Sequence, residues 1–325
     1  MASKNLSLVT FLLGGATMGS TIKFSAKTSR RSFIGLIKAI IGFLYLLIGA
    51  PGHKSKLIAF VIHEVTDEPR EHARLTNTYS TKKIFLKQIS LLSSYFKFID
   101  PLENSSWVNQ KGCLVTFDDG YKGGLEAAKI LEGLKITSIH HVNLNTIQGH
   151  INSSALLHFV NHASGHETNW CDSTPKNLEK LLTKLSDSEL QKVSEFSGPY
   201  MKLSELQELI SLKHAIVGDH LLNHWYTNSL TDTEVLENLS RTSNSSQLKS
   251  IIMPYFAAPH GDLDSQKMEL ISKQGYEVLF SGSSWTRAGK ATIIPRIDLN
   301  NSINSKYRLF GAIAILLVKS KKSKD

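Results

Sequence analysis

Cysteine is scarce in this chain, and proline and glycine are not abundant. The two cysteines among the 325 residues, Cys113 and Cys171, stand in no CxxC spacing, so neither a disulfide framework nor a thiolate zinc site is expected. The 8 prolines and 21 glycines are too few for a fibrous or disordered chain. What is present, 41% hydrophobic and 20% charged residues, predicts a globular protein of one large domain or two small ones.

The central part of the chain also lacks a basic stripe interleaved with aromatic residues. The formal net charge is +9, and the basic excess lies at the two ends of the sequence. It comprises Lys23, Lys27, Arg30, Arg31, Lys38 and the closing run KSKKSK. This distribution favours an anionic membrane surface as the partner, and no nucleic-acid partner is expected.

Two apolar stretches precede the first expected strand. Residues 6–19 (LSLVTFLLGGATMG) are too short to span a membrane and resemble the h-region of a signal peptide, although GATMGS is a poor cleavage site. Residues 33–50 (FIGLIKAIIGFLYLLIGA) have the minimum length for a spanning helix, and Lys38 would cost roughly 2.5–3.5 kcal/mol near its middle. Residues 1–52 are therefore predicted to form a membrane-associated segment, and the apolar and basic residues 301–325 a C-terminal tail.

Three arrangements of residues 33–50 stay open. A weakly polar face at helical spacing, typical of a helix lying in the membrane interface, is formed by Lys38, Gly42, Tyr45 and Gly49. If the helix spans instead, Arg30 and Arg31 should remain cytoplasmic and the rest of the chain would be exported. A buried helix of a soluble protein is the third arrangement. The side of the membrane on which the protein acts is thus left open.

From residue 57 onwards, short apolar runs suited to strands buried on both faces alternate with helical patterns. The runs are LIAFVI (57–62), CLVTF (113–117), SIHHV (138–142), AIVG (215–218), IIMPYFA (251–257) and EVLFSG (277–282). Helices are expected over 81–96, after the capping boxes at 204–207 and 231–234, and up to a C-cap at Gly275. The alternation predicts an α/β fold, either a parallel sheet or a barrel, with an insertion at about 145–200 that contains a Thr174-Pro175 helix start.

The expected strands end in side chains that can carry chemistry. Asp118 and Asp119 follow Phe117 directly and point in different directions, so that one can bind a metal while its neighbour faces a reacting water; a simple Asp-Gly turn before Gly120 is the alternative. His220 and His224 are four residues apart, and one helical turn would place both imidazoles within reach of one ion. Two histidines and one carboxylate leave positions open for water and substrate.

Two further strand ends are candidates. The turn Pro259-His260-Gly261 in FAAPHGDLD has backbone amides that could stabilise an oxyanion, with an ordinary surface turn as the alternative. His63 stands at the tip of the first expected strand, where a histidine is more often structural.

Together these features resemble the NodB-type polysaccharide deacetylases of carbohydrate esterase family 4, across residues 57–300. TFDDGY (116–121) is similar to the family's first motif, the tract PYMKLSELQEL…HAIVGDHLLNH to its helix, strand and second motif, and FAAPHGDLD to its third. Ala257 stands where many members have arginine, His260 replaces the usual tyrosine, and no L-x-H motif follows. A branch with circularly permuted motifs, which deacetylates poly-N-acetylglucosamine, carries a histidine ahead of TFDDG, and His63 in VIHEV is similar to it.

The resemblance implies a deformed (β/α)7-type barrel over 53–300 and hydrolysis of an N-acyl group from an amino sugar of an N-acetylated glycan. It implies a divalent metal, zinc above all, on Asp119, His220 and His224. Asp118 would be the base, His63 the acid, and Arg296 in IPRIDL would orient Asp118. Two rivals stay open: the same chemistry on a polyprenyl-phosphate-linked sugar, and a non-catalytic carbohydrate-binding relative.

Overall fold

The computed structural model describes residues 25–50, 56–103, 105–240, 249–281 and 286–322, and the chain divides into two compact units. One unit is Lys56–Asn301, and the other combines Met1–Ser55 with Ser302–Asp325. The signal-like stretch at 6–19 lies outside the described residues.

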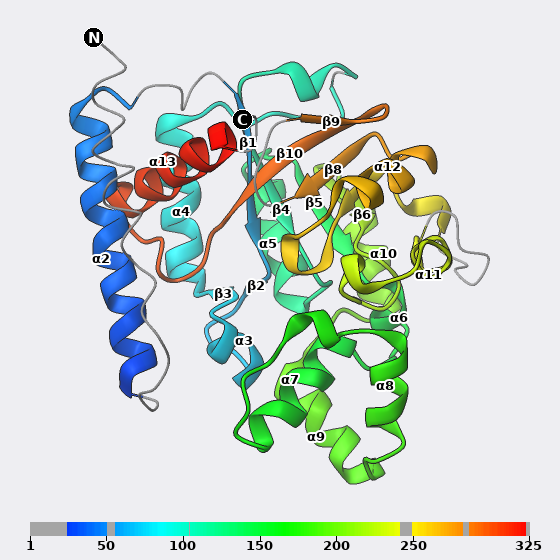
Figure 1. Cartoon of the computed structure of the whole chain (residues 1–325). Coiled ribbons are helices and arrows are strands. Elements are labelled where there is room, and N and C mark those ends of the chain that lie inside the picture. Colours follow the sequence, from blue (N-terminus) through cyan, green and yellow to red (C-terminus); the bar gives the residue numbers. More distant parts are fainter. Residues whose placement is uncertain (1–24, 51–55, 104, 241–248, 282–285, 323–325) are drawn as a thin grey trace. The chain divides into compact units, whose positions relative to one another are not determined.

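The larger unit is built around a closed barrel of parallel strands (Figure 1). Around the barrel the order is β1 (Leu57–Ile62), β4 (Gly112–Phe117), β5 (Ser138–Val142), β6 (Ala215–Asp219), β7 (Tyr255–Ala257), β8 (Val278–Ser281) and β10 (Ala291–Asp298). Strand β10 pairs in parallel with β1, with Arg296 beside Ala59, and this pairing closes the barrel. Outside it, β9 (Thr286–Ala288) lies antiparallel to β10, and β2 (Glu64–Val65) pairs with β3 (Tyr79–Ser80).

Helices connect the strands. They are α3 (Glu71–Thr76), α4 (Lys82–Tyr95), α5 (Lys122–Gly133), α6 (Leu144–Ile147), α10 (Leu203–Ser211), α11 (Asp232–Asn238) and α12 (Ser265–Lys273). The side chain of Thr81 caps α4 by accepting the N–H of Ile84, and Thr231 and Glu234 form the expected capping box of α11. Helix α10, in contrast, begins two residues earlier than expected: Lys202 and not Ser204 is the N-cap, and the Glu205 side chain accepts its backbone N–H.

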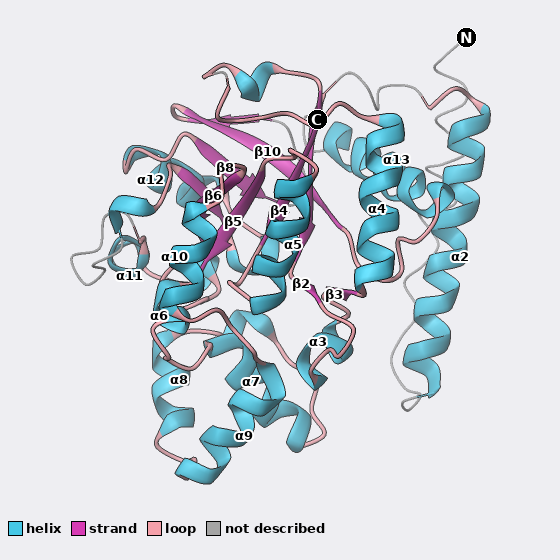
Figure 2. Ribbon diagram, turned by 180° about the vertical axis from the view of Figure 1, so that it is seen from behind, coloured by secondary structure: helices cyan, strands magenta, loops and turns pink. Residues whose placement is uncertain are grey.

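The insertion between β5 and β6 is helical. It contains α7 (Ser153–Ala163), α8 (Pro175–Leu182) and α9 (Asp187–Ser197), and α8 starts at the expected Thr174-Pro175 step. Both ribbon views show these three helices gathered at one end of the barrel (Figure 2). The insertion therefore reaches the edge of the sheet where the strand-end side chains lie, and Ser154 Oγ of α7 is 2.8 Å from Nδ1 of His224.

Apolar side chains fill the barrel and the layer between its strands and the helices. The cluster inside the barrel includes Ala59, Leu114, Ile139, Ile216, Phe280 and Ile294, all at most 4% exposed. A further cluster of buried side chains packs α5 and α10 against β5 and β6, and another packs α11 and α12 against β7, β8 and β10. Burial on both faces explains why the strands read as continuous apolar runs.

In the smaller unit, α2 (Ser25–Leu47) packs against α13 (Lys306–Lys322). The two helices come close together at two glycines: a Cβ atom on Gly42 would overlap the carbonyl oxygen of Tyr307, and one on Gly311 would overlap that of Lys38. The predicted N-terminal segment and C-terminal tail thus share one unit. Among the described residues, no helix is both long enough and apolar enough to cross a membrane.

This close approach makes the helix pair sensitive to side-chain size at residue 311. Gly311→Val should separate α2 from α13 and expose residues 302–322 to protease, because overpacking of a close contact costs about 1–3 kcal/mol or more. The measurement is the rate of limited proteolysis of the full-length protein. Gly133→Val is the matched control, since a Cβ there meets no atom within 4 Å. Equal cleavage rates in the two variants would contradict the helix contact.

Candidate metal centre

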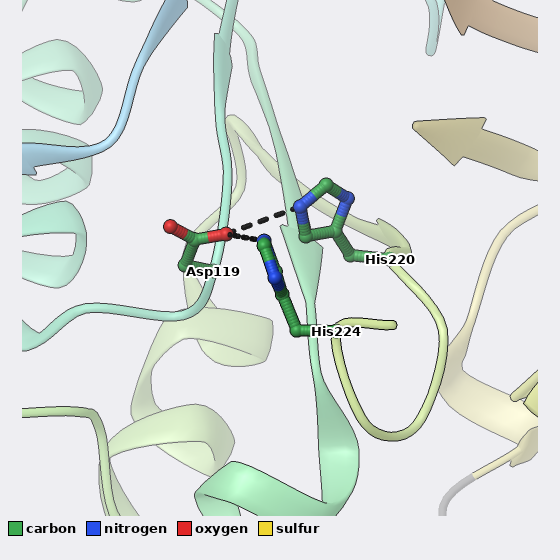
Figure 3. A group of neighbouring side chains, drawn as sticks. All are labelled: Asp119, His220 and His224. Atoms are coloured by element: carbon green, nitrogen blue, oxygen red, sulfur yellow. Dashed lines mark ion pairs between the residues drawn. The ribbon is translucent and has the colours of Figure 1, made fainter. Parts of the chain in front are cut away.

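Three buried side chains, Asp119, His220 and His224, converge at the carboxyl ends of β4 and β6 (Figure 3). The Oδ1 atom of Asp119 lies 3.1 Å from Nε2 of His220 and 2.8 Å from Nε2 of His224. The structure therefore brings together the three side chains that the sequence predicted as metal ligands.

Residues with positive φ angles, and not a helix, bring the three side chains together. Asp119 and Gly120 have φ angles of 72° and 76°, so the chain turns sharply after β4. Leu221 and His224 have φ angles of 60° and 47°. The expectation that one helical turn presents His220 and His224 was wrong: a loop does so, pinned where the N–H of Leu221 donates to Asp219 Oδ1 at 2.9 Å.

The hydrogen bonds of the two imidazoles suit a cation between them. Nδ1 of His220 faces the carbonyl oxygen of Ala257 at 2.8 Å, and a carbonyl can only accept, so this nitrogen carries a proton and, in the neutral ring, Nε2 presents a lone pair. Nδ1 of His224 is bonded to Ser154 Oγ at 2.8 Å. The buried Asp119 Oδ1 has no hydrogen bond of normal geometry among the described residues. Nitrogen and oxygen lone pairs meeting at one buried point fit a divalent metal.

Asp118 lies beside the same cluster, with Oδ2 3.9 Å from Nε2 of His220, and is held by Arg296. Nη1 of Arg296 lies 2.7 Å from Oδ1 and 2.6 Å from Oδ2 of this buried carboxylate, and Nδ1 of His141 lies 3.2 Å from Oδ1. Burial by itself would raise the pKa of Asp118, but the charge of Arg296 outweighs it and holds the pKa far below its ordinary value. Asp118 is therefore ionised and fixed in orientation.

His141 is a neighbour of Asp118 that the sequence analysis missed. It lies on β5, completely buried, and burial lowers its pKa to about 4, so the ring is neutral and donates its Nδ1 proton to Asp118. The ring lies over Gly218 of β6, where a Cβ would come within 2.6 Å of His141 Cδ2. The only sequence signal for this role is the pair of histidines in the apolar run SIHHV. The same run is also typical of a buried strand, so it does not identify His141 as a site residue.

His63 lies between β1 and β2, beside the cluster. The N–H of Asp118 donates to the carbonyl oxygen of Ile62 at 3.1 Å, which places His63 next to the two aspartates. Burial raises the pKa of Asp119, whereas His224, His220 and His63 lower it, and the net shift is well below the ordinary value. His63 is thus close enough to interact electrostatically with the cluster.

The turn Pro259-His260-Gly261 adjoins the cluster on another side. His260 has a φ angle of 63°, and its ring centroid lies 4.9 Å from that of His224 and 5.0 Å from that of Trp170. Burial, followed by the neighbouring His224, lowers the pKa of His260 well below its usual value, so this ring is neutral. All nine side chains and turn residues singled out from the sequence therefore lie around one centre.

Glu64, next to His63, gives this region a pH-dependent stability. It is buried, its Oε2 atom has no hydrogen-bond partner among the described residues, and burial raises its pKa from 4.5 to about 7, against the lowering effect of Arg70. Because the folded-state pKa is the higher one, this group favours folding below the unfolded pKa and costs stability as pH rises toward 7.

Glu64→Gln should therefore match the wild type near pH 4 and exceed its free energy of unfolding by up to about 3 kcal/mol near pH 8. The measurement is chemical denaturation across that pH range. Glu179→Gln, at an exposed residue of α8, should leave the pH dependence unchanged. A constant difference between Glu64→Gln and the wild type at all pH values would contradict the assignment.

No family model matches the sequence, and no curated protein matches it. Solved structures do match the fold. IcaB from Ammonifex degensii is 18% identical with a TM-score of 0.51, covering 79% of this chain and 97% of its own. The deacetylase PplD from Streptococcus pyogenes, solved with acetate, is 12% identical with a TM-score of 0.52 over 79% and 97%. A polysaccharide deacetylase from Bacillus cereus is 14% identical with a TM-score of 0.51 over 79% and 69%.

The chain therefore has the fold of solved polysaccharide deacetylases. The α/β barrel predicted from the resemblance is confirmed, with seven parallel strands among the described residues. The permuted motif order, the membrane-associated helix and the roles of single residues stay predictions.

Proposed function

We propose that this protein is a metal-dependent hydrolase that removes an N-acyl group, acetyl above all, from an amino sugar of a polysaccharide or glycan precursor. The observation that carries the proposal is the buried convergence of Asp119, His220 and His224 beside an ionised Asp118. The fold shared with deacetylases supports it.

The three ligands would hold a divalent cation, zinc above all, and the cation would supply the Lewis acid that polarises the acyl carbonyl. Cobalt or nickel would also suit this ligand set. The remaining chemistry belongs to the chain's own residues.

Asp118 accepts the proton of the attacking water, whose oxygen bonds to the acyl carbon. Arg296 keeps the carboxylate ionised and oriented for this transfer. The backbone N–H of His260 donates to the oxyanion, since that of Gly261 already donates to the carbonyl oxygen of Ala258, and His63 protonates the sugar nitrogen as the carbon–nitrogen bond breaks. The products are a carboxylate and a free amino sugar.

Acetate release tests the proposal. Purified full-length protein loaded with zinc should release acetate from N-acetylglucosamine oligomers, and mass spectrometry should show the loss of one acetyl group for each acetate. Removal of the metal by a chelator should abolish the reaction, and added zinc should restore it. A protein that takes up no metal would overturn the proposal and favour a non-catalytic carbohydrate-binding relative.

We propose further that the smaller unit binds an anionic membrane surface. Residues 1–55 and 302–325 hold 13 lysine and arginine residues and one acidic residue, Asp325, a net charge of +12, while the 24 basic and 27 acidic residues of 56–301 give −3. An apolar stripe at three- and four-residue intervals on α2 supports the proposal. It consists of Phe33, Leu36, Ile40, Phe43 and Leu47, between 47% and 66% exposed.

Vesicle sedimentation tests this membrane proposal. The full-length protein should sediment with phosphatidylserine-containing vesicles, less with pure phosphatidylcholine, and less again at high salt, because salt screens surface charges. The double variant Leu36→Gln and Ile40→Gln should weaken sedimentation, whereas Leu134→Gln, at an exposed leucine of the other unit, should not. Equal sedimentation of all variants, or none of the wild type, would contradict it.

A membrane-bound enzyme would favour the alternative substrate, a sugar carried on a polyprenyl phosphate. Parallel assays on N-acetylglucosamine oligomers and on a polyprenyl-phosphate-linked N-acetyl sugar decide between the two. The lipid-linked substrate would be supported if the wild type has the higher kcat/KM on it and this kcat/KM falls in the Leu36→Gln, Ile40→Gln variant. If the wild type and the variant have equal kcat/KM on each substrate, the polymer would be supported.

A further inference from the structure

Ser154, in the first turn of α7, is the point where the helical insertion meets the metal centre. Its buried hydroxyl oxygen lies 2.8 Å from Nδ1 of His224 and 2.9 Å from Nε2 of His260. It also lies 3.1 Å from the carbonyl oxygen of His224 and 3.2 Å from Oγ of Ser173. One hydroxyl thus joins a predicted metal ligand, the turn after β7 and the insertion.

The chemistry of the partners sets the direction of these bonds in a metal-binding site. A cation needs the lone pair of His224 Nε2, so Nδ1 of His224 must carry the ring proton and donate it to Ser154. Ser154 then has its own proton to donate, and Nε2 of His260 and the carbonyl oxygen of His224 are the two atoms within reach that can accept it. The Ser154 hydroxyl therefore links the His224 ring to the His260 ring, which lies 2.9 Å away on its other side.

The two histidine ligands are therefore supported differently. His220 donates to the backbone carbonyl of Ala257, which is part of β7. His224 instead donates to a side chain of the insertion, and its unusual backbone, with a φ angle of 47°, is held there too: Oγ of Ser153 lies 3.1 Å from its carbonyl oxygen. The barrel orients one ligand, and the insertion orients the other.

We propose that Ser154 is a positioning residue for the cation: its hydroxyl holds the His224 ring with Nε2 toward Asp119 and couples that ring to His260. The inference rests on the proposed function, because it requires the three ligands to bind a metal. It assigns to the helical insertion a part in building the metal centre.

Zinc affinity tests the inference without relying on catalysis. The metal-free full-length protein is titrated with zinc in competition with a chromophoric chelator, as wild type, Ser154→Ala and Ser164→Ala. Ser154→Ala should weaken zinc binding about 10- to 100-fold, the usual effect of losing an outer partner of a ligating histidine. Ser164→Ala is the matched control, because Ser164 ends the same helix and is exposed.

A double-mutant cycle distinguishes positioning from a general loss of structure. His260→Phe keeps a ring but removes the acceptor, so it should weaken zinc binding less than Ser154→Ala does. The double variant should bind zinc with the same affinity as Ser154→Ala alone. The visible spectrum of the cobalt-loaded protein should shift in Ser154→Ala and stay unchanged in Ser164→Ala.

The outcomes separate the two proposals. Equal zinc affinity and equal cobalt spectra in the wild type and Ser154→Ala would overturn the role of Ser154 and leave the proposed function standing. Failure of the wild type to bind zinc or cobalt would overturn both. Additive losses in the double variant would overturn the coupling between His224 and His260.

Discussion

Replacing Asp118 by asparagine is expected to lower the rate of acetate release from N-acetylglucosamine oligomers about 10²- to 10⁴-fold, the range of a lost general base. The amide cannot accept the proton of the attacking water, although it has nearly the same shape and still offers one oxygen to Arg296. The measurement is kcat/KM on the oligomers, together with the metal content of the variant after dialysis.

The metal content makes this result specific. Asp118 makes its close contacts with Arg296 and His141, and the nearest ligand atom, Nε2 of His220, is 3.9 Å from its Oδ2. Asp118→Asn should therefore bind one zinc per chain like the wild type. Asp187→Asn, at an exposed residue of α9, is the control for the chemical change alone. Undiminished activity in Asp118→Asn would refute the assignment of the base.

The second large effect is expected at Asp119. Asp119→Ala removes the only carboxylate of the three-residue cluster and leaves two neutral imidazoles, so zinc affinity should fall by more than the 10- to 100-fold typical of an outer partner. Activity should fall with it, because the chemistry supplied by the cation is lost. Chelator competition measures the affinity, and acetate release measures the activity.

Comparison of the two aspartate variants separates their roles. Asp118→Asn should lose activity although it still binds zinc, whereas Asp119→Ala should lose activity because it no longer binds zinc. A large excess of zinc should therefore restore activity only in Asp119→Ala. The reverse pattern would show that the two neighbouring carboxylates have exchanged roles. Identical metal content in both variants would mean that the cation, if present, is bound elsewhere.

Local sequence predicted much of the barrel. The runs at 57–62 and 138–142 coincide with β1 and β5, and the others overlap β4, β6, β7 and β8. Strands buried on both faces must be apolar throughout, so their composition marks them without knowledge of their neighbours. The run at 251–257 was too long, because Pro254 and the turn before it leave only Tyr255–Ala257 in β7.

Strand β10 was not predicted, although it closes the barrel. Its sequence, ATIIPRID, contains a proline and alternates in polarity near its end, where Arg296 enters the site. Pairing with β1 and β8 compensates for the unfavourable local pattern, and the pairing with β1 joins residues more than 200 positions apart. The predicted role of Arg296 came from family resemblance and not from a strand pattern.

The amino-acid sequence by itself determined which side chains could carry chemistry: two adjacent acids after a buried strand, two histidines four residues apart, and a Pro-His-Gly turn. Residue type and spacing along the chain are set before the chain folds. Only the tertiary structure decided how they meet, because barrel closure sets which strand ends adjoin. Long-range packing thereby placed Arg296 and His141 on Asp118, made a left-handed loop present His224, and brought Ser154 of the insertion against that ligand.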